Sequence, residues 1–496
     1  MSPSPLFLLL LLSSFTLSAQ NLRYTIEVEP QLAKDMRIGV DLEFYHSDRD
    51  TLYIGIPGQI NQVTKVYKHY RNWSVTGGRI IARDSSRITI KRTEKNAPTI
   101  QVHYDIFSPT VGDAVTRTNS SAPLLQPDYL HIRGYSLFLI PLNYKNFDVE
   151  VNWKKIPKGW KIQNSFSANT KQQKFKSTNR EDWRRTNWIA GDFRQYKANV
   201  FGKPVCFAVR GTWNFEDTTL FNIILKTVKT QREQWNDRDI DFYSVSLIPY
   251  RLPAKPSEWD KESLCMGNGL YQSFVTYADE SVLLDDFIDL FNHEMMHEWI
   301  GGRIDEGNAT ASINMRWFVE GFTEYFALRN RWKSGFMTEI EFFSEINEEY
   351  FTRLYASPNA ELPNLVAESR RWESYELERI AYLRGCIAAI YFDMAIRQRS
   401  NNKKNLFNVL NDLMDYTYGT DRNLTDSYDF FVETLAEYYG EDPTQWLNRH
   451  IDQGKKIPAA SFILPNYLVV SSNEAGIPQV RLNKSVKGAA DLFLKD

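Results

Sequence analysis

The chain has 496 residues, of which 43% are hydrophobic and 24% charged, a balance typical of a globular protein rather than a disordered one. This length is sufficient for two or three domains with substantial cores. Because 61 acidic residues nearly cancel 59 basic ones, the net charge gives no support for binding to nucleic acid or to an anionic membrane surface.

The N-terminus carries the run LFLLLLLSSFTLSAQ, in which apolar residues are followed by small ones. A run of this length is typical of a signal-peptide core and is too short to span a bilayer. We therefore expect a signal peptide over residues 1–19 and an exported protein, either periplasmic or secreted, with no membrane span.

Three widely spaced cysteines, Cys206, Cys265 and Cys386, are typical of buried structural residues rather than of a disulfide framework.

The next part of the chain, to about residue 200, has short segments in which apolar and polar residues alternate. This period of two, interrupted by Gly, Pro, Asn and Asp, predicts the strands of an antiparallel domain of the sandwich type. The predicted strands are YTIEVEP, TLYIGIPG, RITIKR, IQVHYDIF, GYSLFLIPL and FDVEVNW. The polar stretch SANTKQQKFKSTNREDW is predicted to be an exposed loop.

From about residue 205 the pattern becomes helical. DTTLFNIILKTVKTQREQW has a helical period, DFYSVSLIPY is predicted to be a strand, and NYLVVSS near the C-terminus is another. Further helices are predicted over 281–300, 315–331, 338–355, 375–399, 403–416 and 425–439. The expected fold class is α+β, with domains over 20–203 and 204–456 and a short extension over 457–496.

The motif HEMMH, His293 to His297, lies on the predicted helix 281–300. Residues four apart on a helix differ by about 40° in direction, so both imidazoles project from one face. Two imidazoles so placed can chelate one Zn²⁺ ion, with Glu294 beside them as a general base for a zinc-activated water. The alternative is a pair of structural histidines on an ordinary amphipathic helix.

A third ligand is expected from a neighbouring helix. The segment MRWFVEGFTEYFALRN offers Glu320 and Glu324, one helical turn apart. Either carboxylate would complete a site with two histidines, one carboxylate and an open position for water. Periodicity alone does not choose between them.

HEMMHEWIGG followed by RWFVEGFTEYF resembles the gluzincin metallopeptidases, most closely the glycyl aminopeptidase family and more distantly the aminopeptidase N family. The resemblance implies a thermolysin-like catalytic domain with one Zn²⁺ per chain. The Glu that precedes Gly-Phe is the metal ligand in these families, which selects Glu320. Glu324 is either the carboxylate that contacts a metal-bound imidazole from outside the ligand set or a solvated helix residue.

The segment AYLRGCIAAIYFDMAIR is similar to the Tyr-x-Lys-Gly helix of that family. The resemblance assigns to Tyr382 the phenol that stabilises negative charge on the substrate oxygen. Arg384 stands where Lys is usual, which keeps the charge but changes the shape of the side chain.

The chain departs from the family pattern at two places. MGNGLYQSF puts Tyr271 where the resemblance expects the Glu that binds the free amine of the substrate. Gly267, Gly269, Leu270 and Tyr271 are nevertheless predicted to bind the substrate, with backbone groups of the two glycines serving an extended peptide. The family usually has a PDZ domain after the catalytic domain, and the forty residues here predict no full PDZ domain.

The sequence therefore predicts an exported zinc metallopeptidase that acts on peptides or proteins. It is expected to resemble an aminopeptidase, although the loss of the amine-binding Glu leaves exopeptidase specificity open. The alternative is a catalytically inactive peptide-binding module that retains the zinc-site fold.

Overall fold

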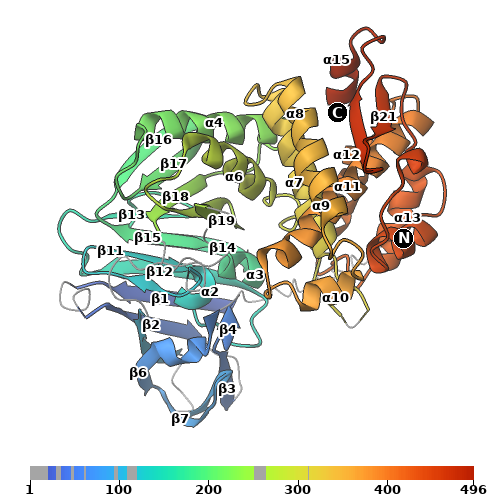
Figure 1. Ribbon diagram of the computed structural model, residues 1–496. Helices are drawn as coiled ribbons and strands as arrows, with labels where there is room; N and C mark the ends of the chain where they lie inside the picture. The colour runs from blue at the N-terminus through green and yellow to red at the C-terminus, as the bar shows by residue number, and fades with distance from the viewer. Residues whose placement is uncertain are drawn as a thin grey trace, which may run out of the picture.

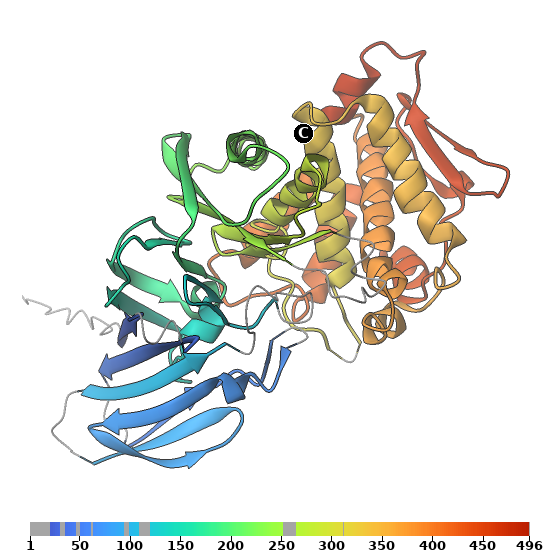
Figure 2. The ribbon, with the colours of Figure 1, turned by 60° about the vertical axis from the view of Figure 1, so that its left-hand side comes forward.

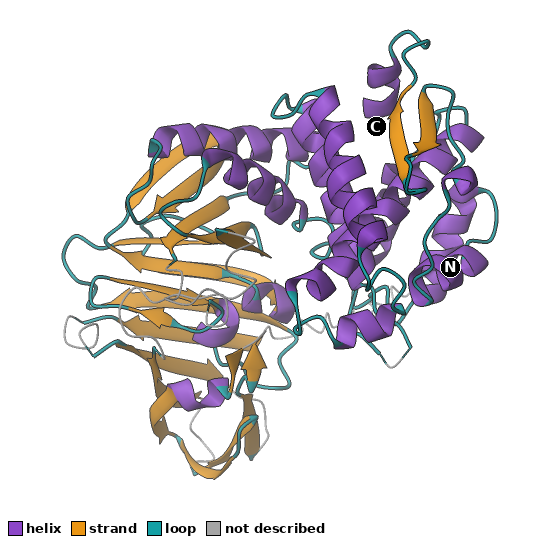
Figure 3. Ribbon diagram, viewed as in Figure 1, coloured by secondary structure: helices purple, strands orange, loops and turns teal. Residues whose placement is uncertain are grey.

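The computed structural model describes residues 20–29, 35–45, 50–60, 63–93, 99–108, 120–250, 264–310 and 312–495. The predicted signal peptide over 1–19 lies outside the described residues. Strands occupy the N-terminal part and helices the C-terminal part, so the α+β class is confirmed (Figures 1 and 3).

The N-terminal part contains a six-stranded sheet in the order β14-β12-β1-β2-β9-β6, faced by the three-stranded sheet β3-β8-β7. Leu22, Tyr24 and Ile26 of β1 are buried while the residues between them are more exposed, as the alternating sequence predicts. The strands are β1 Gln20–Glu27, β2 Arg37–Tyr45, β3 Thr51–Gly55, β6 Tyr70–Thr76, β7 Gly78–Arg83, β8 Arg87–Arg92, β9 Thr99–Phe107, β12 Asn146–Lys154 and β14 Gln172–Asn179. The small strands β4 Gln59–Ile60 and β5 Val63–Thr64 pair with each other.

A four-stranded sheet, in the order β10-β11-β15-β13, forms the middle layer. Trp188 and Ala190 of β15 join the N-terminal core, whereas Ile189 between them packs against the second half of the chain. Both faces of this sheet are therefore covered, which explains why its central strands are buried throughout. The strands are β10 Leu124–Leu125, β11 Tyr129–Arg133, β13 Lys161–Asn164 and β15 Asn187–Gly191.

A five-stranded sheet, in the order β16-β17-β18-β20-β19, begins the second half. Strands β17, β18 and β20 are parallel, and the two edge strands are antiparallel to their neighbours. The bounds are β16 Arg194–Val200, β17 Lys203–Val209, β18 Tyr243–Pro249, β19 Cys265–Leu270 and β20 Ser273–Ala278. Helices α4 Asp217–Gln234 and α6 Leu284–Met296 share a core with this sheet (Figure 1).

The helical region packs around the long helix α11, which is buried along most of its length. The helices are α7 Arg316–Lys333, α8 Glu339–Glu345, α9 Arg353–Ala356, α10 Asn364–Ser369, α11 Tyr375–Arg399, α12 Leu406–Thr417, α13 Tyr428–Tyr439 and α14 Thr444–Leu447. π-Helical turns over Ile346–Thr352 join α8 to α9, so the helix predicted over 338–355 is continuous in space. No helix within the described ranges is long and apolar enough to cross a membrane.

The C-terminal forty residues form the hairpin β21 Leu468–Ser472 and β22 Pro478–Leu482, followed by α15 Ala489–Leu494. They lie against the helical region (Figure 2). Phe493 is fully buried and stacks on Trp332 of α7, with 5.6 Å between the ring centroids. Arg329, also on α7, donates to the Phe493 carbonyl at 2.9 Å. The extension is thus part of the helical core.

Two predictions for the N-terminal part are wrong. GYSLFLIPL begins with the short helix α2 Gly134–Leu137 instead of a strand, because the Phe138 N–H donates to the Gly134 carbonyl in a helical turn. The predicted loop SANTKQQKFKSTNREDW contains the edge strand β14 and the helix α3 Arg180–Arg184. A polar sequence is compatible with an edge strand, since one side of it faces solvent.

Helices α7 and α11 are in direct backbone contact through Gly321 and Gly385. A Cβ on Gly385 would lie 1.8 Å from the Trp317 carbonyl oxygen, and a Cβ on Gly321 would lie 2.2 Å from the Gly385 Cα. Only glycine permits this approach. Because α7 carries Glu320 and α11 carries Tyr382, the contact sets the distance between these two predicted site residues.

The substitution Gly385→Ala is expected to reduce the free energy of unfolding by about 3 kcal/mol, since the added methyl group meets backbone that cannot move aside. The helix propensity gained from alanine, about 1 kcal/mol, is too small to offset this clash. Denaturant unfolding measures the change. Gly58→Ala is the control, because its Cβ would meet nothing closer than 3.8 Å. Equal stability of the two variants would contradict the packing argument.

Candidate metal centre

The two histidines of the HEMMH motif converge at the end of α6. Phe287, Phe291 and Met295 recur along α6 and are buried in the core that it shares with the sheet. His293 lies in the last turn and His297 directly follows the helix. The Nε2 atoms of the two imidazoles are 3.0 Å apart.

Glu320 of α7 completes the group. Its Oε2 atom lies 3.5 Å from the Nε2 atom of each histidine. One donor atom from each of the three residues fits within a 4.8 Å span, and no other such group of His, Cys, Asp and Glu occurs in the part of the chain that the structure describes. The structure therefore brings together the three residues that the sequence proposes as ligands.

The donor atoms fit a metal ion. His297 Nδ1 lies 3.0 Å from the Ile300 carbonyl oxygen, a contact that assigns the ring proton to Nδ1 and leaves the Nε2 lone pair for a ligand. Among the donor atoms at the centre, Glu320 Oε2 is buried without a hydrogen-bond partner. Two imidazole nitrogens and a carboxylate are the donor set of a catalytic zinc site.

Glu324 lies behind His293, with its Oε1 atom 3.7 Å from the His293 Nδ1 atom. Tyr350 donates to this carboxylate at 2.7 Å and Arg379 at 3.2 Å. Burial alone would raise the pKa of Glu324, but Arg379 and His293 outweigh it and lower the pKa. Glu324 is therefore an ionised group directed toward the outer nitrogen of His293.

Glu294 lies on the side of α6 that faces the edge strand β19. A Cβ on Gly267 would lie 2.4 Å from the Glu294 Cγ, so glycine at this position makes room for the carboxylate. Burial raises the pKa of Glu294, and the neighbouring imidazoles and a hydrogen bond from the Gly269 backbone partly offset the rise. A carboxyl group with a raised pKa is suited to take up and release a proton near neutral pH.

Tyr382 on α11 lies across the site from α6. Its ring stacks against His293, with centroids 5.8 Å apart, and it lies between two guanidinium groups, with Arg316 at 5.0 Å and Arg379 at 4.4 Å from the ring centroid. Burial raises the pKa of Tyr382 well above its ordinary value, so the phenol stays protonated and can donate. Arg384 points away from the site and donates to the carbonyls of Ala360 and Leu362.

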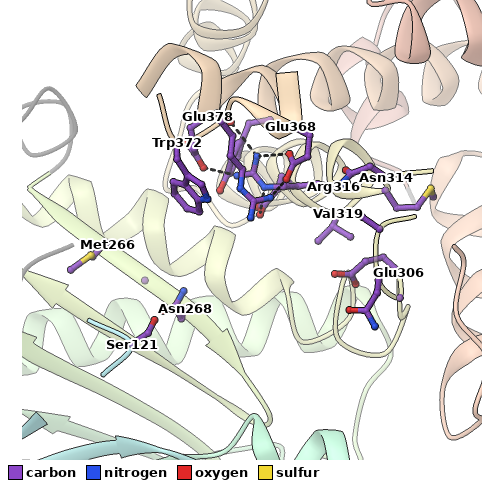
Figure 4. Close-up of a pocket in the computed structure, with 18 of the residues that line it drawn as sticks. Ser121, Met266, Asn268, Glu306, Asn314, Arg316, Val319, Glu368, Trp372 and Glu378 are labelled. Atoms are coloured by element: carbon purple, nitrogen blue, oxygen red, sulfur yellow. Dashed lines mark hydrogen bonds and ion pairs between the residues drawn. The ribbon is translucent and has the colours of Figure 1, made fainter. Parts of the chain in front are cut away.

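Two cavities meet at this centre. The first, about 680 Å³, is lined by Glu320 and Tyr382, and Figure 4 shows Ser121 and Asn268 across it from Arg316. The second, about 1020 Å³, is lined by His293, Glu294, Glu324 and Tyr382, together with further acidic residues and three arginines. Both cavities also touch Gly267. The two cavities therefore meet at the edge strand β19, beside the proposed ligands.

The structure corrects part of the predicted substrate-binding set. Gly267 lines both cavities. Gly269 instead lies under His297, since a Cβ added to Gly269 would be 2.7 Å from the His297 Cβ. Leu270 is buried in the core between the sheets. Tyr271 lies beyond the end of β19, where its N–H donates to the Arg185 carbonyl, and its ring packs on Phe166. The turn at the end of the strand thus directs Tyr271 away from the cavities.

Sequence reasoning missed three polar residues of the site. Asn268 lines the first cavity from β19, Arg316 lies one turn before Glu320, and Arg379 lies one turn before Tyr382. The i, i+4 spacing of Arg316 and Glu320 was visible in the sequence. Nothing in the sequence indicated that Arg379 pairs with Glu324, because 55 residues separate them.

Residues 286–404, which carry this site, match the family model described as M61 glycyl aminopeptidase. The chain is a zinc peptidase, and this segment of it is similar to that family. The resemblance predicted from the motifs is therefore confirmed. No curated protein matches the chain.

Solved structures similar to this peptidase share its fold at low identity. An aminopeptidase N family protein from Idiomarina loihiensis aligns with a TM-score of 0.71 and 14% identity, covering 91% of this chain and 79% of that chain. An M1 zinc metallopeptidase from Deinococcus radiodurans aligns with a TM-score of 0.58 and 14% identity, covering 90% and 96%. A mutant of the latter, bound to a Tyr-Ser-Ala substrate, aligns with a TM-score of 0.52 and 14% identity, covering 89% and 95%.

Zinc binding to this peptidase is expected to weaken as the pH falls. Burial lowers the pKa of His297 but Glu320 outweighs it, so the pKa is raised to about 9 in the metal-free site. Below that pH a proton must leave before the imidazole can act as a ligand, which weakens zinc binding by about tenfold per pH unit. Calorimetry between pH 6 and 8, in buffers of different ionisation enthalpy, measures the affinity and the proton released. A pH-independent affinity would contradict the expectation.

Proposed function

We propose that this chain is an exported metallopeptidase in which His293, His297 and Glu320 hold one Zn²⁺ ion. The observation that carries the proposal is the convergence of these three donors, with the Glu320 Oε2 atom among them buried and without a hydrogen-bond partner, beside the buried carboxylate of Glu294. The division into a β domain over 20–203, a catalytic domain over 204–456 and an extension over 457–496 is part of the proposal.

The side chains around the centre have complementary roles in peptide hydrolysis. When bound, zinc polarises the scissile carbonyl and lowers the pKa of water. Glu294 takes the proton from the attacking water and then delivers it to the leaving amine, for which its raised pKa is suited. Tyr382 donates to the carbonyl oxygen as negative charge develops on it. Glu324 holds the imidazole of His293 from the outer side.

The positions of Glu294 and Tyr382 favour catalysis over the alternative of an inactive peptide-binding module. A module that only binds would need neither a buried carboxylate beside the ligands nor a phenol across from them. The substrate bound to the Deinococcus radiodurans mutant is a short peptide, which supports peptides as the substrate class here.

Substitution Glu294→Gln is expected to lower kcat by at least about a thousandfold, because the amide cannot accept the proton, whereas zinc content stays near one per chain. Elemental analysis gives the metal content, and turnover is measured on a mixed peptide library with and without a chelator. Asp285→Asn, at the start of the same helix, is the control. Turnover by the Glu294→Gln protein at the wild-type rate would refute the role.

Substitution Tyr382→Phe is expected to lower kcat by about a hundredfold with little change in KM, since the phenol contributes only as charge develops on the substrate oxygen. Steady-state kinetics on a peptide found in the library experiment measures both constants. Tyr375→Phe, at the first turn of α11, controls for loss of a hydroxyl at the cavity wall. An unchanged kcat for Tyr382→Phe would remove the phenol from the mechanism.

A further inference from the structure

Arg133, the last residue of β11, is a buried cation for which the described residues provide no counter-ion. Its side chain is only 3% exposed. It donates to the Ser121 hydroxyl at 3.3 Å, to the Tyr135 phenol at 2.7 Å and to the Asn268 amide oxygen, and its Nε has no partner. These acceptors are neutral, and among the described residues no carboxylate pairs with this guanidinium. A buried charge in a protein is normally paired.

The contact between Arg133 and Asn268 fixes the orientation of the Asn268 amide. A guanidinium only donates hydrogen bonds, so the amide atom that faces Arg133 is Oδ1. The N–H₂ end of Asn268 is left for a group in the first cavity, which Asn268 lines (Figure 4). This wall of the cavity therefore presents a donor backed by a positive charge, which suits an anionic oxygen and disfavours an ammonium group.

The carboxylates of the same cavity do not neutralise this charge, because they are engaged elsewhere. Glu378 and Glu368 pair with Arg316 at 2.5 and 3.5 Å, on the opposite wall in Figure 4. Glu320 belongs to the proposed ligand set. Burial raises the pKa of Glu306 to about 7, so this group is only partly ionised at neutral pH.

We infer that the substrate supplies the missing anion: the peptidase prefers substrates with a carboxylate that lies against Asn268, in front of Arg133. The preference rests on the proposed function. The carboxylate can belong to an acidic side chain, to the C-terminus of a short peptide or to an acidic group on the N-terminus. In each case its oxygen accepts from the Asn268 amide, and the positive charge of Arg133 stabilises the bound form.

The test uses zinc-loaded wild-type protein and matched substrate pairs that differ in one carboxylate. One pair has Glu or Gln beside the cleaved bond, one has a free or an amidated C-terminus, and one has an N-succinyl or an N-succinamoyl cap. The ratio of kcat/KM within each pair measures the preference. We expect the acid to be favoured by about tenfold in at least one pair, which also identifies the source of the carboxylate.

The variant Asn268→Asp tests the wall itself. The new carboxylate pairs with Arg133 and repels a substrate anion, so the ratio of kcat/KM for acid over neutral substrate is expected to fall to about one or below. Asn308→Asp is the matched control, because Asn308 lines the same cavity and has no hydrogen bond to Arg133. It is expected to keep most of the preference. Circular dichroism confirms that both variants are folded.

The outcomes separate this inference from the proposed function. If wild-type protein cleaves peptides but favours the acid in none of the pairs, or if Asn268→Asp keeps the preference, the inference is wrong and the proposed function stands. If no peptide is cleaved, the proposed function fails, and binding of the same pairs to the zinc-loaded Glu294→Gln protein decides the inference. Equal binding within every pair would then overturn it.

Discussion

The approach of the Glu320 carboxylate to two imidazoles is the constraint on which the rest of the structure depends. Three partly buried ionisable groups whose donor atoms lie 3.0 to 3.5 Å apart are costly to hold in place, unless a cation binds between them. The fold positions them through backbone contacts instead of flexible side chains. Gly269 lets α6 lie directly on β19, and Gly321 and Gly385 let α7 lie directly on α11.

The same close packing determines what surrounds the metal ligands. Because Gly267 leaves room for Glu294, the carboxylate is buried beside the proposed ligands with a raised pKa, which suits the proposed role of a proton carrier. Because α11 crosses α7 at Gly385, Tyr382 enters from the opposite side and lies between Arg316 and Arg379. Glu294 and Tyr382, to which the proposed function gives the roles of proton carrier and oxygen donor, therefore reach the same cavity from different helices.

The side chains on two sides of the site differ in how their charges are paired. Around His293, Glu324 and Tyr350 form a fixed network with Arg379 that serves the ligand set. Across the first cavity, Arg133 has no carboxylate partner within the described part of the chain, and it donates to Asn268, which lines the cavity. The chain thus combines the proposed metal centre with a cavity wall for which the sequence motif gave no indication, since Arg133 and Asn268 are 135 residues apart.

The sequence by itself determined the helices, the alternating strands and the ligand motif, because these depend on local periodicity and on side chains four residues apart. His293, Glu294 and His297 needed no tertiary information, and a family resemblance was enough to select Glu320. Only the tertiary structure decided which residues face the cavities. Strand β19 ends at Leu270, so Tyr271 turns away and Asn268 takes its place on the wall. It also decided that GYSLFLIPL is not a strand, because an apolar run buried on all sides has no period that distinguishes strand from helix.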